Sequence, residues 1–310
     1  MFLAAGAAAC LVAGSATHAW TALYTANALG LLALLWIALD ARFAYTPLAL
    51  VIVVALAPRL IAVFADPLFE DDWYRYLWDG LTSLASGDPY RLPPAAAFGD
   101  ATLSPAQQAL LSGINHPELP TIYGPALQAL FTAAAWIAPA ELWPLKAMLL
   151  AVDLATLALL THLGVQTRWL LVYAVHPLIA RETLANAHPD GLVGLLLLAT
   201  LVAWRARYAV GVGICFGAAL ATKVAALVVL PLLMREPHAR RPGLWIITLG
   251  LTATASVSLL YLPFLAGGTD LASLAVFARA RRSGWLADGE WDSVVALTHE
   301  RVRELLGDER

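Results

Sequence analysis

Between Thr46 and Gly80 the chain reads TPLALVIVVALAPRLIAVFADPLFEDDWYRYLWDG, in which an apolar run passes directly into a polar one. The apolar part, Thr46 to Ala65, has the length of about 20 residues that a helix needs to cross a bilayer. The polar part, Glu70 to Gly80, predicts a helix at the membrane surface, with its apolar side toward lipid and its carboxylates toward water. A solvated surface anchor and an active-site helix are both compatible with this stretch alone.

Helical periodicity gathers the polar side chains of this run on one face. Four of them stand at positions i, i+3, i+4 and i+7, so one face carries two carboxylates, a guanidinium and a phenol. These residues are Asp72, Arg75, Tyr76 and Asp79.

The composition places the chain among helical membrane proteins. Of its 310 residues 60% are hydrophobic and only 13% are charged, whereas soluble domains are about 25% charged. The mean hydropathy is +0.72. Since lipid leaves only helices or closed barrels for the backbone, and strand alternation is absent from the sequence, we predict an all-α polytopic transmembrane protein. The net charge of −3 lacks the excess of basic residues that is typical of nucleic-acid-binding proteins.

Charge and proline divide the sequence into four regions. They are N-terminal transmembrane helices, an outer loop, a transmembrane helix bundle and a charged C-terminal segment, in residues 1–65, 66–125, 126–265 and 266–310. The loop is rich in acidic residues, proline and glycine, and its only basic residues are Arg75 and Arg91. This lack of basic residues predicts the outer, non-cytoplasmic side of the membrane.

The apolar segment Ala126–Ala138 is too short to cross comfortably, and we expect a re-entrant or surface helix. The later apolar segments are Leu145–Leu163, Trp169–Leu184, Leu192–Trp204, Val210–Met234 and Leu244–Leu265. His188 and a hairpin turn at Lys223 then lie outside, while Arg168 and Arg205 lie inside. If Ala126–Ala138 spans instead, His188 faces the cytoplasm and Arg205 faces out. The positive-inside rule favours the first topology.

Three charged side chains lie within or beside apolar runs. Arg59, near the outer end of its run, is either functional or long enough to reach the interface. Lys223 needs an anionic partner or a watery cavity, or else it marks a hairpin tip that faces headgroups. Asp153 could be the structural partner of a buried cation.

The run Asn186–Gly191 interrupts an apolar region with a histidine, a proline and an acid. Its spacing does not match a zinc motif, so we predict no metal there, and an ordinary polar turn is the simpler interpretation.

The cysteines, Cys10 and Cys215, are small apolar residues within apolar runs. Carboxylates and cations beside apolar walls suit an amphiphilic substrate with a lipid tail, an anionic phosphate and a reacting hydroxyl.

Four motifs resemble those of a known family. Residues Asp71–Gly80 look like the first outer loop of bacterial GT-C fold glycosyltransferases, and most like the polyprenol-phosphate-mannose-dependent mannosyltransferases. The segments Ile114–Pro125, His188–Gly191 and Thr222–Pro231 are similar to further motifs of that family, in the same order. Each motif alone is weak evidence for the family, but the occurrence of all four in the same order is fairly specific to it.

The chain departs from the family pattern at two positions and in length. Gly124 stands where the family usually has proline, and Asp88 stands where asparagine is common. Family members usually continue through several more transmembrane helices after Leu265, whereas residues 288–310 are a charged segment here. A compact variant and a shortened chain are both compatible with this difference.

The resemblance implies a multi-pass glycosyltransferase of the bacterial inner membrane. It would move a sugar, mannose in this family, from a polyprenyl-phosphate donor to a hydroxyl of a lipid or glycan acceptor, with inversion. A divalent metal assists in some members of the wider fold, but nothing in this sequence requires a metal or a cofactor. The general base would be Asp72, with Asp71 as second choice. Contacts to the donor phosphate would come from Arg75, Arg59, Lys223 and His188. Further substrate contacts would come from Tyr76, Asp79, His116, Tyr123 and Asp190.

Two other classes remain compatible with the sequence. A transporter or flippase of lipid-linked sugars would also need cations and apolar walls, although a long acidic loop with aromatic residues is less expected there. A non-catalytic subunit of a cell-envelope assembly is the third class. If the protein hydrolyses a labelled polyprenyl-phosphate sugar, or transfers the sugar from it, the protein is a glycosyltransferase rather than a member of either of these two classes.

Overall fold

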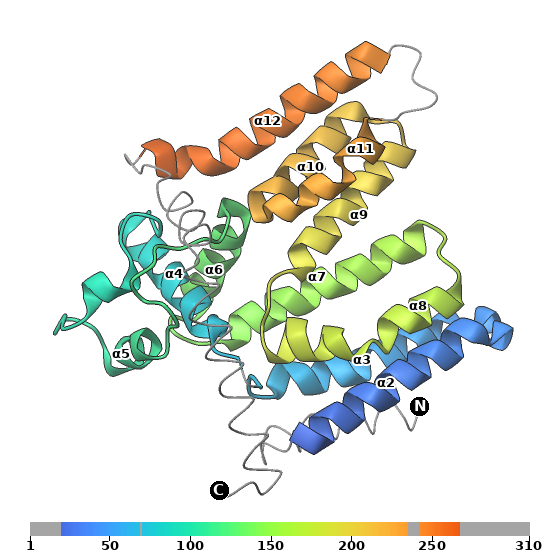
Figure 1. Cartoon of the computed structure of the whole chain (residues 1–310), viewed down its shortest axis with the longest axis horizontal. Helices are drawn as coiled ribbons and strands as arrows, with labels where there is room; N and C mark the ends of the chain where they lie inside the picture. Colours follow the sequence, from blue (N-terminus) through green and yellow to red (C-terminus); the bar gives the residue numbers. More distant parts are fainter. Residues whose placement is uncertain (1–19, 69, 235–241, 267–310) are drawn as a thin grey trace, which may run out of the picture.

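The computed structural model describes residues 20–68, 70–234 and 242–266, and within them the chain is helical and has no strand (Figure 1). The predicted all-α class is therefore confirmed. The first 19 residues of the predicted N-terminal transmembrane region and the charged segment 288–310 lie outside the described residues. The elements are α2 (Trp20–Leu39), η1 (Ala41–Tyr45), α3 (Leu48–Phe64), α4 (Asp72–Ser86), η2 (Pro94–Ala97), α5 (Pro105–Ser112), α6 (Pro125–Ile137), α7 (Trp143–His162), α8 (Thr167–Ala174), η3 (Ile179–Ala185), α9 (Gly191–Arg205), α10 (Ala209–Thr222), η4 (Val224–Val229), α11 (Leu230–Leu233) and α12 (Pro242–Ala266).

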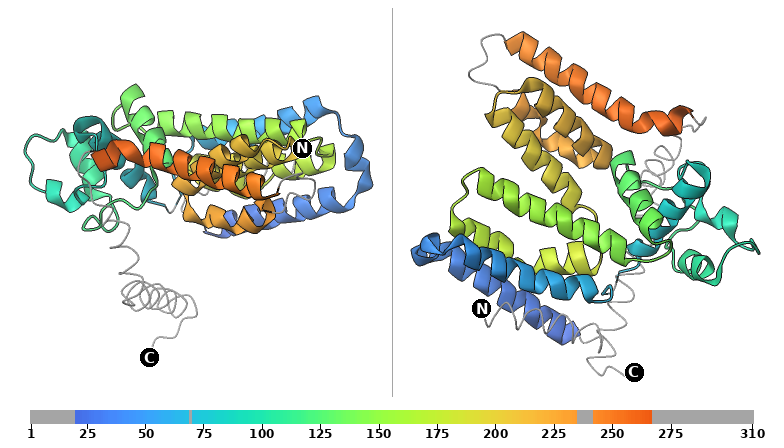
Figure 2. Two further views of the ribbon diagram at one scale, coloured as in Figure 1. Left: turned by 90° about the horizontal axis from the view of Figure 1, so that it is seen from above. Right: turned by 180° about the vertical axis from the view of Figure 1, so that it is seen from behind.

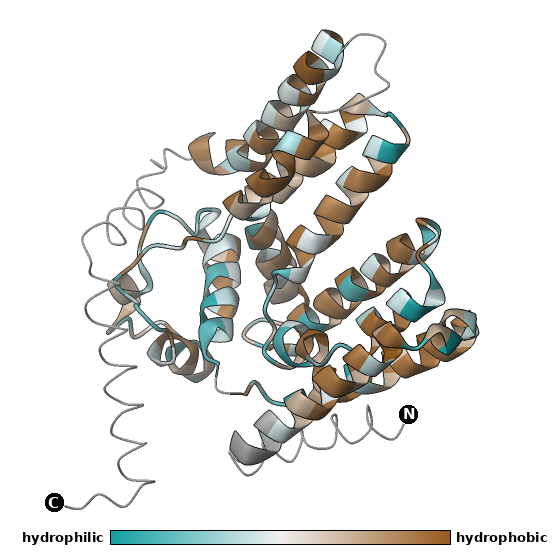
Figure 3. Ribbon diagram, turned by 45° about the vertical axis from the view of Figure 1, so that its right-hand side comes forward, coloured by the Kyte–Doolittle hydropathy of each residue, from teal (hydrophilic) through white to brown (hydrophobic). Residues whose placement is uncertain are grey.

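The long helices form a flat slab, with α4, α5 and α6 gathered at one end of it (Figures 1 and 2). Apolar residues cover much of the long helices, whereas α4 and its neighbouring loops are rich in polar ones (Figure 3). Two described helices, α7 and α12, are long and apolar enough to cross a membrane. The other apolar helices among the described residues are shorter, so a multi-pass arrangement stays a prediction.

Helix α4 confirms the predicted helix but buries the face that was expected to meet water. Arg75, Tyr76 and Asp79 are all buried, on the side of α4 that packs against α6. The prediction that the carboxylates point to water is wrong for Asp79, which is 2% exposed. Its carboxylate accepts hydrogen bonds from Arg75 Nε (2.8 Å), from Gln128 Nε2 (3.0 Å) and from the Thr121 hydroxyl. Because these donors satisfy it, the carboxylate can leave water.

Helices α4 and α6 approach each other closely at Gly80. Tyr76 of α4 stacks on Phe131 of α6, with ring centroids 4.9 Å apart. A Cβ added at Gly80 would overlap the backbone carbonyl of Phe131, so no side chain fits between the two helices. The glycine therefore lets α4 lie against α6, which in turn places the acidic start of α4.

The variant Gly80→Ala should lower the free energy of unfolding by about 1–3 kcal/mol, the usual cost of overpacking a tight contact. The matched control is Gly194→Ala in α9, where an added Cβ meets no atom within 4 Å. There alanine should be neutral or mildly stabilising, because it favours the helix over glycine. Thermal unfolding in detergent, followed by circular dichroism, compares the two variants. An unchanged midpoint for Gly80→Ala would contradict the close approach of α4 and α6.

The apolar segment Trp169–Leu184, predicted as one span, consists of two elements. Helix α8 ends at Ala174 and the π-helix η3 begins at Ile179, with Pro177 between them. Proline lacks a backbone N–H and its ring clashes with the preceding helical turn, which explains the break. The prediction of a single helix here is therefore wrong.

Arg59 forms an ion pair with Asp153 between α3 and α7, and both side chains are almost fully buried. The guanidinium also donates to the carbonyls of Ala55 (2.9 Å) and Ala174 (2.6 Å), and the Tyr173 hydroxyl donates to Asp153 (2.6 Å). Asp153 is thus the partner of a buried cation, as the sequence suggested. The structure does not bring Arg59 to the other predicted phosphate contacts, because all of its nitrogens already have protein partners.

The polar motifs lie at one end of the helices. Helix α9 runs from just after His188 to Arg205, whose Nη1 donates to the carbonyl of Leu163 beyond the end of α7 (3.0 Å). Helix α10 runs back and ends at Thr222, and Lys223 after it is extended with φ −153°, so the helix is interrupted where the sequence predicts a hairpin turn. His188 and Lys223 therefore lie at the opposite end from Arg205, as the preferred topology requires. Which end faces outward stays a prediction.

Candidate active site

Two carboxylates lie at the start of α4. Glu70 precedes the helix, and its Oε1 accepts hydrogen bonds from the backbone N–H groups of Asp71 and Asp72, both at 3.2 Å. Asp72 is the first residue of α4, and its side chain is 43% exposed. A carboxylate at this position is stabilised by the positive end of the helix dipole. These hydrogen bonds occupy Oε1 of Glu70, so its Oε2 and the carboxylate of Asp72 remain available to a partner.

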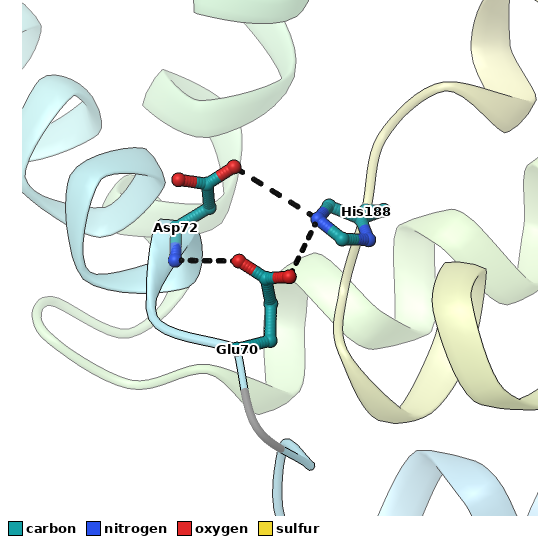
Figure 4. A group of neighbouring side chains, drawn as sticks. All are labelled: Glu70, Asp72 and His188. Atoms are coloured by element: carbon teal, nitrogen blue, oxygen red, sulfur yellow. Dashed lines mark hydrogen bonds and ion pairs between the residues drawn. The ribbon is translucent and has the colours of Figure 1, made fainter. Parts of the chain in front are cut away.

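That partner is His188, from the loop between η3 and α9 (Figure 4). Its Nε2 lies 3.4 Å from Glu70 Oε2 and 3.9 Å from Asp72 Oδ2. The sequence predicted both Asp72 and His188 as site residues, and the structure brings them together. Glu70 completes the group, which we call the Glu70–Asp72–His188 cluster.

The other side of the imidazole is held by Glu182 in η3. His188 Nδ1 lies 3.3 Å from Glu182 Oε2, and the backbone N–H of His188 donates to the carbonyl of Glu182 at 2.9 Å. Glu182 also accepts hydrogen bonds from Asn186 Nδ2 (2.9 Å) and Arg181 Nε (2.6 Å). Sequence reasoning missed Glu182. The available signal was its charge and that of Arg181 inside an apolar segment, where ionisable residues are rare and functional.

The surrounding carboxylates determine the charge of His188. The neighbouring carboxylates of Asp72 and then Glu182 raise the pKa of His188 to about 10, against the opposing effect of burial. The imidazole is therefore protonated at neutral pH in this arrangement. A cation thus lies directly beside the carboxylate of Asp72.

A second ion pair joins the two neighbouring motifs. Lys223 Nζ lies 2.8 Å and 2.9 Å from the two carboxylate oxygens of Asp190, and both side chains are more than half exposed. Gly124, at the start of α6, packs against the end of α10, where an added Cβ would overlap the carbonyl of Ala221. The proline that the resemblance leads one to expect at this position would not fit here. All four predicted motifs therefore meet at one end of the helices.

Aromatic residues border this region. Tyr76 is 1% exposed and lies edge-on to Tyr123, with ring centroids 5.1 Å apart. Burial raises the pKa of both hydroxyls well above the usual range, so both stay protonated. Tyr90 donates to the carbonyl of Tyr123 at 2.8 Å, and Asp88 accepts from the backbone N–H of Tyr90 at 3.0 Å. Tyr76 is therefore a core residue, and only Tyr123 of this predicted pair has an accessible surface.

Three predicted residues make contacts away from the cluster. Asp71 accepts a hydrogen bond from Asn115 Nδ2 at 2.5 Å, which ties the loop after α5 to the start of α4. His116 lies in that loop with Nδ1 3.4 Å from Glu118 Oε1. Arg75 turns its Nε to Asp79, and its Nη2 is buried with no hydrogen-bond partner among the described residues. The structure thus directs Arg75 inward rather than toward His188.

Comparison with known proteins identifies the family. Residues 2–236 match the family model described as the alpha-(1→6)-mannopyranosyltransferase, N-terminal domain. None of the curated proteins and none of the solved structures matches the chain. The matched range contains the four motifs and the Glu70–Asp72–His188 cluster, and it covers well over half of the chain. The protein therefore belongs to the alpha-(1→6)-mannopyranosyltransferase family, a family of mannosyl-transferring glycosyltransferases.

Proposed function

We propose that this protein moves mannose from a polyprenyl-phosphate donor to an acceptor hydroxyl at the outer face of the membrane, with inversion at the anomeric carbon. The observation that carries the proposal is the accessible carboxylate of Asp72, which lies beside the cationic His188 in a chain of a mannosyltransferase family. A carboxylate in this position can accept a proton, and the charges around it can meet an anionic substrate.

The reaction is a single displacement. Asp72 takes the proton of the acceptor hydroxyl, and the acceptor oxygen forms a bond to the anomeric carbon. The bond between that carbon and the donor phosphate oxygen breaks, and polyprenyl phosphate leaves with the electron pair. The negative charge that develops on the phosphate needs positive charge already in place.

Lys223 supplies that charge in our proposal. Its ammonium is 52% exposed and pairs with Asp190 at the same end of the helices as Asp72. A donor phosphate can replace or join Asp190 as its partner. Arg75 and Asp79 instead hold α4 against α6, and Arg59 stabilises the helices through Asp153, so neither arginine enters the displacement.

A transfer assay tests the proposal. The full chain, purified and reconstituted in lipid nanodiscs, is incubated with labelled polyprenyl-phosphate mannose and a mannose oligosaccharide, and the products are analysed by mass spectrometry. We expect one added mannose in an α-(1→6) linkage and a loss of affinity for polyprenyl phosphate in Lys223→Ala. Arg205→Ala, at the opposite end of the helices, is the matched control. Transfer from a nucleotide sugar alone, or lipid movement without any sugar transfer, would refute the proposed reaction.

The outer location predicts a pattern of chemical labelling. Ser112 in α5 and Gln166 before α8 are both exposed and lie at the two predicted sides. In a background with Cys10 and Cys215 replaced by alanine, Ser112→Cys should react with an impermeant maleimide added to intact cells. Gln166→Cys should react only after the membrane is permeabilised. Labelling of position 166 but not 112 in intact cells would reverse the topology.

A further inference from the structure

The Glu70–Asp72–His188 cluster has the dimensions of a metal site. One oxygen of each carboxylate and one imidazole nitrogen all lie within 4.8 Å of one another. The distances from His188 Nε2 are 3.4 Å to Glu70 Oε2 and 3.9 Å to Asp72 Oδ2. Around a tetrahedral ion with bonds of about 2.0–2.2 Å, neighbouring ligand atoms are about 3.3 Å apart. The separation of His188 Nε2 from Glu70 Oε2 already matches this spacing, whereas the Asp72 carboxylate must move closer to the imidazole to share an ion with it.

Two of the three ligand atoms are oriented by contacts to the other polar atom of the same side chain. Backbone N–H groups hold Oε1 of Glu70, so that Oε2 faces the imidazole (Figure 4). Glu182 holds Nδ1 of His188 at 3.3 Å, so that Nε2 faces both carboxylates. A histidine that binds a metal usually has a carboxylate or carbonyl on its other nitrogen, which orients the ring and makes it a better ligand. Glu182 is itself held by Arg181 and Asn186.

We propose that Glu70, Asp72 and His188 bind a divalent transition-metal cation such as Zn²⁺ or Mn²⁺. One imidazole nitrogen and two carboxylate oxygens are the donor set that these ions accept, whereas Mg²⁺ and Ca²⁺ prefer oxygen alone. The three side chains are 24–43% exposed, so such an ion keeps positions open for water or substrate. Three protein ligands with an open position are typical of metal sites that take part in chemistry rather than closed structural ones.

Charge balance favours such an ion. Nε2 of His188 faces the carboxylates of both Glu70 and Asp72, whereas Glu182 on the other side of the ring is already paired with Arg181. A divalent cation among the three side chains balances both carboxylates. The zinc-motif spacing that the sequence lacks is no obstacle, because these ligands come from the beginning of α4 with the residues before it and from the loop before α9, which are far apart in the chain.

Metal binding can be measured on the full chain without any sugar donor, so the result is independent of the proposed transfer reaction. The purified protein is treated with EDTA and dialysed, then titrated with ZnCl₂ and with MnCl₂ by calorimetry, and its bound metal is counted by mass spectrometry. We expect one ion per chain for at least one of the two metals, and a higher midpoint of thermal unfolding when it is bound. An absence of stoichiometric binding for both metals would overturn the proposal.

Variants locate the ion. Glu70→Gln and His188→Gln should abolish the stoichiometric binding, and Glu182→Gln should weaken it by about 10–100-fold, the usual effect of removing an orienting partner. The matched control is Glu118→Gln, which removes the carboxylate beside His116, an exposed pair of the same residue types. Unfolding midpoints of the metal-free variants show which are folded, and Glu182→Gln tests the site through a residue that touches no metal. Unchanged binding in the folded variants would overturn the proposal.

Discussion

Replacing Asp72 with asparagine should lower mannosyl transfer by about 10²–10⁴-fold, the usual contribution of a positioned general base. Asparagine keeps the shape of the side chain and much of its hydrogen bonding, but it cannot take a proton from the acceptor. Affinity for polyprenyl phosphate should survive, because the base contacts the acceptor rather than the phosphate. Initial rates of transfer and calorimetry with polyprenyl phosphate measure the two quantities.

Two further variants show whether the loss of transfer in Asp72→Asn is specific to that carboxylate. Asp100→Asn is the matched control, because Asp100 lies exposed in the same loop and only caps a turn through Thr102. It should transfer mannose at nearly the parent rate. Asp71→Asn tests the second candidate base, whose carboxylate is paired with Asn115. A parent rate in Asp72→Asn together with a large loss in Asp71→Asn would move the base to Asp71.

The variant Asp153→Ala should lower the free energy of unfolding by about 3–5 kcal/mol. Arg59 is 1% exposed and Asp153 is 3% exposed, so the substitution leaves a guanidinium buried without its counter-charge. Breaking a buried ion pair from one side costs about this much, because the remaining charge keeps its desolvation penalty. Denaturant unfolding in detergent micelles measures the loss.

A double variant separates the ion pair from the packing around it. Arg59→Met combined with Asp153→Leu removes both charges and should restore much of the stability, since apolar replacements of a buried pair are often neutral or favourable. Its affinity for polyprenyl phosphate should equal that of the parent. A stable Asp153→Ala variant, or a double variant with weakened phosphate affinity, would contradict a purely structural role for Arg59.

Local patterns predicted much of the fold and part of the site. The helix at Asp72–Ser86 follows from its own periodicity, and the break at Lys223 follows from a charge inside an apolar run. The meeting of His188 and Lys223 at one end follows from helix lengths, because two antiparallel helices of similar length return the chain to its starting level. These predictions rest on short-range sequence signals, which is why they could be made without the structure.

The features of the fold and the site that the sequence did not predict depend on contacts between residues that are distant in the chain. Asp79 is buried because Thr121 and Gln128, more than 40 residues later, donate to it. Helical periodicity alone predicted that the face of α4 that carries Asp79 is exposed to water. The orienting role of Glu182 depends on a π-helix, whose five-residue hydrogen-bonding pattern has no distinct apolar period to read in the sequence.

The ion pair of Arg59 and Asp153 also has a consequence for biosynthesis. The two residues are 94 positions apart, so at about 5–20 residues per second the ribosome adds the second roughly 5–20 s after the first. If α3 enters the bilayer during this interval, it does so with an arginine that lacks its counter-charge, and the cost of inserting such a residue rises to about 2.5–3.5 kcal/mol at mid-membrane. Asp153 in α7 then supplies the missing counter-charge. In that case, the stable integration of α3 depends on the synthesis of a helix that follows it in the chain.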